Sequence, residues 1–293
     1  MHYAIGDVHG SYDELMDLLN MIEKHDNDAR FIFLGDFVDR GPDVWKVLEW
    51  IMNNISIDGK YQSVMGNHES LIIDWYKEWL YWWNRGGFDG EDLMPETHFD
   101  FTYWLDSMNC LSPEKIEPII SFFKSLPTRK EIIITTPSGR HIQYNIVHAW
   151  DAFDKNLSED EIKNINLWKR NCYGNYENDI IIVHGHTPTI SDMYKSTGFT
   201  RPGMIAYRHN SINIDGGCCF SDNYRQYPCF LCAICLETLE EFYNCDLDER
   251  MHKIKRSYES DEDIQLKINA YKKYFIENDD LFRNKLLKRL NIR

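Results

Sequence analysis

The chain has 293 residues, of which 43% are hydrophobic and 27% are charged, as in an ordinary soluble globular protein. Its formal net charge is −15, which argues against a protein that follows a nucleic-acid backbone with a basic face. No run of eighteen apolar residues predicts a membrane-spanning helix, and the first residues lack the basic region of a secretory signal. We therefore expect a cytoplasmic protein whose partner is neither a long nucleic acid nor a membrane.

Short apolar runs alternate with helical patterns along the chain, which predicts βαβ units and a largely buried sheet. Strands are expected at residues 3–5, 31–34, 61–65, 142–147, 180–183, 212–214 and 230–236. Four helices are expected from their first turns: a capping box of Ser11 with Glu14, Pro42, Ser112 followed by Pro113, and a capping box of Ser158 with Glu161.

The chain ends in a charged segment after about residue 250. One or two amphipathic helices are expected there, with Ile268, Tyr271 and Phe275 on a common stripe. The segment could serve as a partner-binding or dimerising appendage, although a charge run is more often a solvated helix face.

Tryptophans are concentrated between the third and fourth predicted strands, at Trp75, Trp79, Trp82, Trp83 and Trp104. We expect them to pack their helices on the sheet, because large aromatic side chains are mostly buried. The alternative is a cap or a binding surface beside the active site.

Cys229, Cys232 and Cys235 show CxxC spacing twice. No second CxxC or CxxH pair completes a four-ligand zinc site. We therefore interpret this stretch as a buried strand in which cysteine acts as a small hydrophobic residue.

Polar side chains follow five of the predicted strands at the point where each strand ends. In an open α/β sheet these carboxyl ends form one rim, where ligands bind. Carboxylate, imidazole and amide oxygen suit a pair of manganese, iron or zinc ions, and an aspartate can bridge two ions. The residues are Asp7, His9, Asp36, Asp39, Arg40, Asn67, His68, His148, His184 and His186.

The segments GDVHG (6–10), GDFVDRG (35–41) and GNHE (66–69) closely resemble the signature of the PPP-type, calcineurin-like metallophosphoesterases. Later blocks resemble the bacterial and phage branch, which includes lambda-type serine/threonine protein phosphatases and symmetrical diadenosine tetraphosphatases. These blocks are WNRGG (83–87), HAW (148–150), WKR (168–170), HGHTP (184–188) and NIDGG (213–217). The resemblance covers roughly residues 1–240 and implies an α/β fold. Its central mixed β-sheets would be flanked by helices, with the metal site at the strand carboxyl ends.

Carried over residue by residue, the resemblance implies two metal ions, manganese by expectation and iron or zinc as alternatives. Asp7, His9 and Asp36 would hold the first ion, and Asp36 would bridge to the second. The second ion would be completed by Asn67, His148 and His186. A water or hydroxide held between the ions would attack phosphorus.

The resemblance also implies the remaining catalytic roles. His68 would be the general acid that protonates the leaving oxygen, and Asp39 would orient its imidazole. Arg40 would bind the phosphoryl oxygens through its planar fork, and Arg170 is the candidate for a second clamp. Arg201 and Arg208 are alternative phosphate clamps.

Two histidine assignments have competitors. His141 lies on the opposite face of its strand from His148, which is nearer the strand end and is preferred. Spacing alone does not separate His184 from His186, and the family pattern selects His186. Pro188 stands where many wider relatives carry a second histidine ligand, which favours the PPP arrangement.

We expect a catalytic domain over residues 1–240, with a helical, tryptophan-rich insertion at about 70–130, and a charged helical extension over 241–293. The leading hypothesis is hydrolysis of phosphate monoesters, with phosphoserine and phosphothreonine in proteins as the default substrates. The alternative is a dinucleoside tetraphosphate hydrolase or other nucleotide hydrolase. A non-catalytic binding module is a third reading, but it requires missing ligands and none is missing.

Overall fold

The computed structural model describes residues 1–85, 112–135, 139–152, 156–170, 180–191, 201–220, 227–255, 257–276, 281–290 and 292. The first of two five-stranded sheets has the order β10-β9-β1-β2-β3. It consists of β1 (His2–Ile5), β2 (Arg30–Phe33), β3 (Tyr61–Ser63), β9 (Cys232–Cys235) and β10 (Glu241–Tyr243). Strands β1, β2 and β3 run parallel, and β9 is antiparallel to both of its neighbours.

The second sheet has the order β4-β5-β6-β8-β7. It consists of β4 (Arg129–Thr135), β5 (His141–Val147), β6 (Ile180–His184), β7 (Ala206–Arg208) and β8 (Ser211–Asn213). Its three central strands β5, β6 and β8 are parallel, and the two edge strands are antiparallel to their neighbours. The mixed α/β fold expected from the sequence is confirmed, and each predicted strand is present.

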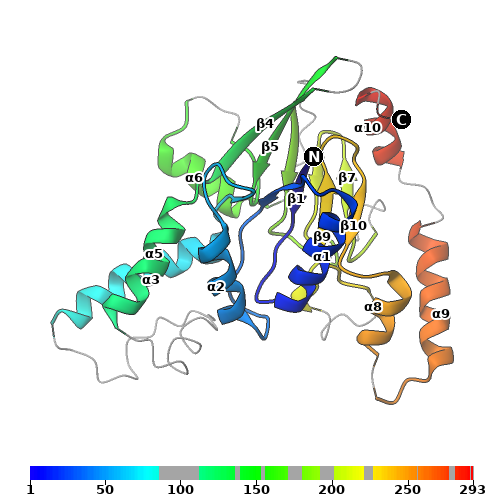
Figure 1. Ribbon diagram of the computed structural model, residues 1–293, viewed down its shortest axis with the longest axis horizontal. Helices are drawn as coiled ribbons and strands as arrows, with labels where there is room; N and C mark the ends of the chain where they lie inside the picture. Colours follow the sequence, from blue (N-terminus) through cyan, green and yellow to red (C-terminus); the bar gives the residue numbers. More distant parts are fainter. Residues whose placement is uncertain are drawn as a thin grey trace.

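The described helices surround the two sheets (Figure 1). They are α1 (Tyr12–His25), α2 (Val44–Asn54), α3 (Asn67–Trp83), α5 (Pro113–Ser125), α6 (Glu159–Trp168), α8 (Leu247–Lys253), α9 (Asp261–Tyr271) and α10 (Leu281–Leu290). A short 3-10 turn, Cys218–Phe220, and a π-helical turn, Lys272–Ile276, complete the set. No described helix is long and apolar enough to cross a membrane.

The strands of both sheets bury side chains on both faces. Ala4 and Ile32 of the first sheet share a core with Tyr144 and Val183 of the second, so this core lies between the sheets. The neighbouring side chains, such as those of Tyr3 and Ile5, point the other way and pack with α1, α2, α3 and α5. Helix α6 packs Ile165 on the outer face of the second sheet. The layers are therefore helix, sheet, sheet, helix.

One of the four expected helix starts is wrong, and another lacks its predicted capping box. Ser11 is the N-cap of α1, as expected, but its side chain makes no capping bond, and Glu14 forms an ion pair with Arg250 at 3.0 Å. Pro42 lies outside α2, whose N-cap is Asp43. The other two are confirmed: Ser112 precedes Pro113 at the start of α5, and Ser158 forms a capping box with Glu161 in α6.

The tryptophan-rich helix packs largely as expected. Trp75 and Trp79 of α3 are buried against the helical core, whereas Trp83 is 43% exposed. Trp104 lies outside the described residues. The cysteine-rich stretch leads into the buried strand β9, and its cysteines form no disulfide with one another or with another described residue.

The C-terminal stripe is present, since Ile268 and Tyr271 of α9 are buried and Phe275 packs on Tyr271 with ring centroids 5.0 Å apart. The Tyr271 hydroxyl donates to the Pro202 carbonyl at 2.8 Å, which fixes α9 to the loop before β7. The division of the chain near residue 240 stays a prediction.

Candidate metal centre

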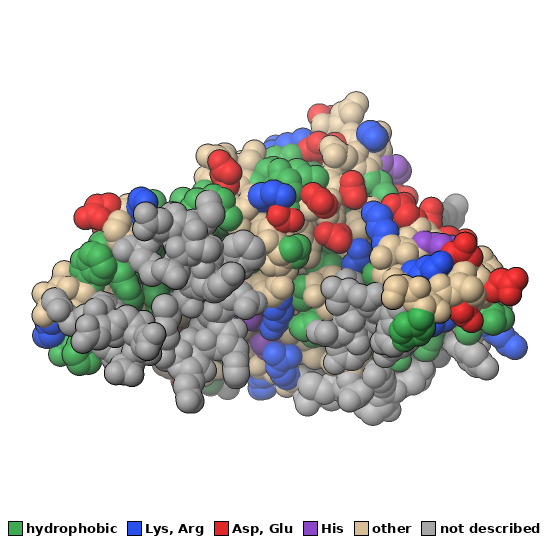
Figure 2. Space-filling view, turned by 90° about the horizontal axis from the view of Figure 1, so that it is seen from below, with side chains coloured by type: hydrophobic (Ala, Val, Ile, Leu, Met, Phe, Trp, Pro, Cys, Tyr) green, Lys and Arg blue, Asp and Glu red, His purple; other side chains and the backbone are tan. Residues whose placement is uncertain are grey.

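The six predicted metal ligands meet at the carboxyl ends of strands from both sheets. Asp7 and His9 follow β1, Asp36 follows β2, and Asn67 opens α3 directly after β3. His148 follows β5 and His186 follows β6 of the second sheet. All six side chains are buried, with residue exposures of 5% or less. Seen from below, Lys or Arg and His side chains reach the surface near the middle of this face (Figure 2).

The backbone at this rim is strained. Seven described non-glycine residues have a positive φ, and five of them are predicted site residues. Such conformations cost about 1–3 kcal/mol each and persist only where the surrounding structure enforces them. Their concentration here indicates that the loops are shaped for a function. The five are His9, Asp36, Asp39, Arg40 and His186.

Two glycines allow the site loops to approach one another. A Cβ at Gly66 would lie 2.2 Å from the Asp36 amide nitrogen, and a Cβ at Gly185 would lie 2.1 Å from Asp7 Oδ1. Because real Cβ atoms do not come this close, position 66 requires glycine, and a side chain at position 185 would displace the Asp7 carboxylate. Asp7 also accepts a hydrogen bond from the His186 amide at 3.0 Å, so the loops after β1 and β6 are joined.

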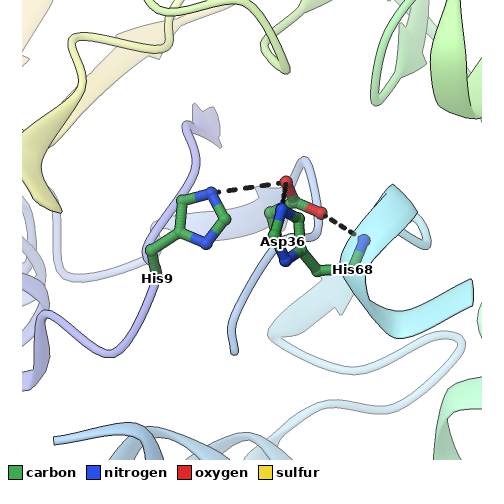
Figure 3. Close-up of side chains that lie close together, drawn as sticks. All are labelled: His9, Asp36 and His68. Carbon is green, nitrogen blue, oxygen red and sulfur yellow. Dashed lines mark hydrogen bonds and ion pairs between the residues drawn. The ribbon is translucent and has the colours of Figure 1, made fainter. Parts of the chain in front are cut away.

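One cluster of candidate ligands consists of His9, Asp36 and His68 (Figure 3). The His9 Nδ1 donates to the Val38 carbonyl at 2.8 Å, which leaves the lone pair on Nε2. That Nε2 lies 3.4 Å from Asp36 Oδ2. Two acceptors therefore face each other, and a cation between them would be stabilised.

A second cluster shares Asp36 and adds His148 and His186. The His148 Nδ1 contacts the Leu34 carbonyl at 2.9 Å, and its Nε2 lies 3.3 Å from Asp36 Oδ2 and 2.7 Å from Asn67 Oδ1. The His186 Nδ1 is 2.8 Å from the same Asn67 oxygen. Asp36 is therefore the side chain common to both clusters, as a bridging ligand requires.

Two buried atoms of the site have no hydrogen-bond partner among the described residues, Asp7 Oδ1 and His186 Nε2. Leaving a buried polar atom unsatisfied costs about 1–3 kcal/mol. Carboxylate, imidazole and amide oxygen are ligands that suit manganese, iron and zinc. These residues consequently fit a pair of divalent cations, and the unsatisfied Asp7 Oδ1 is available as a ligand.

The pKa values of these side chains reflect closely packed carboxylates. Burial, together with the charge of Asp215, raises the pKa of Asp7 well above its usual value. Burial alone would lower the pKa of His148, but the charge of Asp36 raises it to about 9. The carboxylates therefore hold a proton on His148, and bound divalent ions would supply the same compensating charge.

Burial has the opposite effect on the other two histidines. It lowers the pKa of His9 to about 4, with help from the Arg40 charge, and that of His186 to about 2. Both imidazoles are therefore neutral at physiological pH, which is the form that binds a metal.

His68 and Asp39 form the predicted dyad. The His68 Nδ1 lies 2.5 Å from Asp39 Oδ2, and Asp39 is buried. The Arg40 guanidinium contacts the Nε2 atoms of both His9 and His68, the latter at 3.0 Å. Arg40 also lies over the Phe220 ring, 5.1 Å from its centroid. Because Arg40 is exposed as a residue, it can reach a ligand above the buried site.

Arg170 reaches the same rim from the end of α6. Its Nη1 donates to the His186 carbonyl at 3.2 Å and to Thr187 Oγ1 at 2.9 Å. Arg201, one alternative clamp, lies elsewhere and pairs with Glu241 at 2.7 Å. Arg208, the other, is on β7, where its charge adds to the effect of burial in lowering the pKa of His184. Of the three arginines, Arg170 is therefore the one that borders the candidate ligands.

The rejected histidines lie away from the clusters. His141 is exposed at the start of β5 and contacts the Thr135 hydroxyl. His184 is buried with its ring edge-on to Trp150, 5.4 Å between centroids.

Two acidic residues of the site were not assigned from the sequence. Glu69 is fully buried, and its carboxylate accepts bonds from the amides of Asp36, Phe37 and Gly66 at 2.8–2.9 Å. Asp215 is buried after β8 and accepts from the Gly217 amide. Burial raises the pKa of Asp215 to about 6. Its place after a predicted strand is the signal that identified the other site residues.

Comparison with known proteins agrees with this geometry. Residues 3–216 match the model of the calcineurin-like phosphoesterase family. A bis(5'-nucleosyl)-tetraphosphatase PrpE of Halalkalibacterium halodurans, named as asymmetrical, is 26% identical over 245 residues, covering 74% of this chain and 85% of that protein. A symmetrical bis(5'-nucleosyl)-tetraphosphatase of Coxiella burnetii is 29% identical over 188 residues, covering 59% and 57%.

Among solved structures, a protein serine/threonine phosphatase of Saccharomyces cerevisiae superposes with a TM-score of 0.41 and 16% identity, covering 72% of this chain and 65% of that one.

Proposed function

The chain belongs to the calcineurin-like phosphoesterase family, and on this premise we propose that it hydrolyses dinucleoside tetraphosphates. The observation that carries the substrate class is the similarity to a bis(5'-nucleosyl)-tetraphosphatase that spans 85% of that relative's length. This similarity favours a nucleotide hydrolase, which was the alternative hypothesis from the sequence, over a phosphoprotein phosphatase, which was the leading one.

We propose Asp7, His9, Asp36, Asn67, His148 and His186 as the ligands of two divalent ions, with Mn²⁺ as the first metal to test. Bound ions of this kind supply Lewis acidity and lower the pKa of water so that it can act as a nucleophile near neutral pH. Asp36 would serve both ions, because its Oδ2 faces His9 at 3.4 Å and His148 at 3.3 Å. Glu69 supports this position by holding the Asp36 and Phe37 amides.

The remaining site residues would bind the phosphate chain and protonate the leaving group. The exposed guanidinium of Arg40 and that of Arg170 would bind phosphoryl oxygens at the rim. His68 would give its Nε2 proton to the leaving oxygen, while its Nδ1 donates to Asp39. The carboxylate of Asp39 accepts this hydrogen bond and fixes the orientation of the imidazole ring.

Phosphoprotein hydrolysis remains the second candidate, and the His68–Asp39 dyad is the observation that favours it. A serine or threonine oxygen is a strongly basic leaving group and needs a proton as the P–O bond breaks. A phosphate leaving from an anhydride needs one much less.

A substrate panel tests the proposal. The full chain is incubated with Mn²⁺ and diadenosine tetraphosphate, p-nitrophenyl phosphate or a phosphoserine peptide, and the products are separated by ion exchange. Cleavage of the tetraphosphate next to a terminal phosphorus gives ATP and AMP, whereas cleavage at the centre gives two ADP. We expect the tetraphosphate to have the highest kcat/KM. A phosphopeptide turned over at least tenfold faster, with the dinucleotide left intact, would overturn the proposal in favour of the second candidate.

Asn67→Ala provides the control for the site itself. In this variant the turnover of diadenosine tetraphosphate and that of the phosphoserine peptide should fall together. Elemental analysis should show less bound metal than in the parent chain. Full activity of Asn67→Ala would contradict the assignment of the metal ligands.

A further inference from the structure

A second cationic pocket lies between α10 and the turn that joins β7 to β8. Its volume is about 140 Å³, and it is lined by His209, Asn210, Lys285, Leu286 and Arg289. Strand β8 runs parallel to β5 and β6, whose carboxyl ends carry His148 and His186. Because residues 209–210 precede β8, the pocket is at the opposite end of the second sheet from the metal ligands. Figure 1 shows α10 beside the C-terminus at that end.

Arg289 is the distinctive residue of this pocket. Its Nη1 donates to Asn210 Oδ1 at 2.5 Å, but its Nε and Nη2 are buried and have no acceptor among the described residues. A guanidinium that is partly buried is normally paired through its fork with a carboxylate or a phosphate. None of the five lining residues carries a carboxylate. The unsatisfied donors therefore call for an anion.

The position of Arg289 near the C-terminus of α10 offers a simpler explanation, because cations are favoured at this end of a helix. That explanation leaves the two donors unsatisfied. The Arg289 carbonyl at the helix end already accepts from Arg140 Nη1 at 2.7 Å, which adds a further cation to the group. Helix capping thus accounts for Arg140, but Nε and Nη2 of Arg289 still have no acceptor among the described residues.

The size of the pocket limits the ligand. Sites for drug-sized molecules occupy about 300–1,000 Å³, so a pocket of about 140 Å³ does not enclose a nucleoside. It suits a single tetrahedral oxyanion. In a chain with a net charge of −15, a pocket whose described lining includes Lys285, Arg289 and His209 and no acidic residue is also a local exception.

We propose that this pocket binds a phosphate-type oxyanion, either free phosphate or the terminal phosphoryl group of a nucleotide. The anion accepts hydrogen bonds from Arg289 and Lys285 and joins α10 to the β7–β8 turn. This site is separate from the metal centre, and its existence does not depend on the proposed substrate.

Calorimetric titration of the metal-free full chain with inorganic phosphate tests the proposal. The variants are Lys285→Gln and Arg289→Gln, and Lys288→Gln is the matched control, since it removes the same charge from α10 at a residue that does not line the pocket. We expect phosphate to bind at least fivefold more weakly to Lys285→Gln and to lose this site in Arg289→Gln. The control should bind as the parent chain does.

Equal phosphate binding by the parent chain and Lys285→Gln would overturn the proposal. This comparison decides the matter even where Arg289→Gln fails to fold, because Lys285 is exposed. A parallel titration with metal-free ATP distinguishes the sources. Binding of ATP that is weakened by Lys285→Gln assigns the site to a nucleotide's terminal phosphoryl group, and Lys285-dependent binding of phosphate alone assigns it to the free ion.

Discussion

The proton on His68 is a residue-level feature whose contribution depends on the substrate. Its ring is held by Asp39 at 2.5 Å, and its Nε2 lies 3.9 Å from Asp36 Oδ2 at the edge of the metal centre. General acid catalysis typically contributes about 10²–10⁴ in rate, and it matters most where the leaving oxygen is a strong base. The His68 side chain should therefore contribute more to the hydrolysis rate of a phosphoserine peptide than to that of a dinucleoside tetraphosphate.

We predict that His68→Ala lowers kcat on a phosphoserine peptide by about 10²–10⁴ and on diadenosine tetraphosphate by clearly less. Asp39→Asn should act in the same direction with a smaller effect, because the asparagine oxygen still accepts the hydrogen bond that orients the His68 ring but carries no charge. Steady-state kinetics on both substrates measures this split. His141→Ala is the control, since that histidine is exposed at the start of β5, and it should leave both rates unchanged. An equal decrease of kcat on the two substrates would show that His68 does not act as the general acid for the leaving group.

Residue types at strand ends allowed most of the candidate site to be predicted from the sequence. Asp7, Asp36 and His148 were found because ligands gather where parallel strands end. Glu69 was missed because its carboxylate accepts from the backbone amides of Asp36 and Phe37, and such partners are not visible as residue types. Asp215 was missed although it follows a predicted strand in the same way as the residues that were found.

At the scale of elements, the same sequence pattern at the start of α1 and of α6 leads to different hydrogen bonds. Both α1 and α6 begin with serine followed three residues later by glutamate. In α6 the Glu161 amide donates to Ser158 Oγ at 3.3 Å, and the Ser158 amide donates to Glu161 at 2.8 Å. In α1, Arg250 forms an ion pair with Glu14, and the Cys218 thiol donates to Ser11 Oγ at 3.4 Å. Tertiary contacts have replaced the local cap.

We predict that Ser158→Ala destabilises the chain by about 1 kcal/mol, as expected for the loss of an N-cap. Ser11→Ala removes no capping bond and should cost less. Urea unfolding of the two variants and the parent chain measures the difference. A larger loss for Ser11→Ala than for Ser158→Ala would mean that α1 is capped by its serine after all.

The three described strands that the sequence did not reveal, β4, β7 and β10, are edge strands. Strand β4 begins with charged residues, and its Ile133 is 66% exposed, so its pattern does not resemble a buried strand. Strands β7 and β10 have three residues each, too few for a period to appear. The central strands were predictable because they are buried on both faces. Two facing sheets, in place of one open sheet, followed from the family resemblance rather than from any local pattern.

At the scale of the whole molecule, Glu241 connects three parts of the structure. It lies on β10 of the first sheet, and its Oε1 accepts from Arg201 at 2.7 Å and from the hydroxyl of Tyr207 on β7 at 2.9 Å. Arg283 of α10 approaches the same oxygen at 3.3 Å. The Glu241 side chain is 11% exposed. One carboxylate therefore links both sheets and the last described helix.

The pKa of Glu241 gives this link a pH dependence. Burial alone would raise its pKa, but the charge and hydrogen bond of Arg201, with that of Tyr243, lower it below the usual value. A carboxyl group whose pKa is lowered by folding stabilises the folded chain above the unfolded pKa of about 4.3, and this contribution is lost as the pH falls through the folded value.

We predict that Glu241→Gln lowers the free energy of unfolding by about 3 kcal/mol at pH 7, because it leaves the Arg201 guanidinium buried without its counter-charge. The difference from the parent chain should shrink as the pH falls below the unfolded value and through the lowered pKa of Glu241 in the folded chain, where this residue itself becomes neutral. Urea unfolding at several pH values measures both effects. Glu240→Gln is the matched control, since its side chain is 49% exposed and contacts only His25 among the ion pairs of the described residues. A Glu241→Gln penalty that stayed constant down to acid pH would mean that packing, not charge, connects β10 to the second sheet and α10.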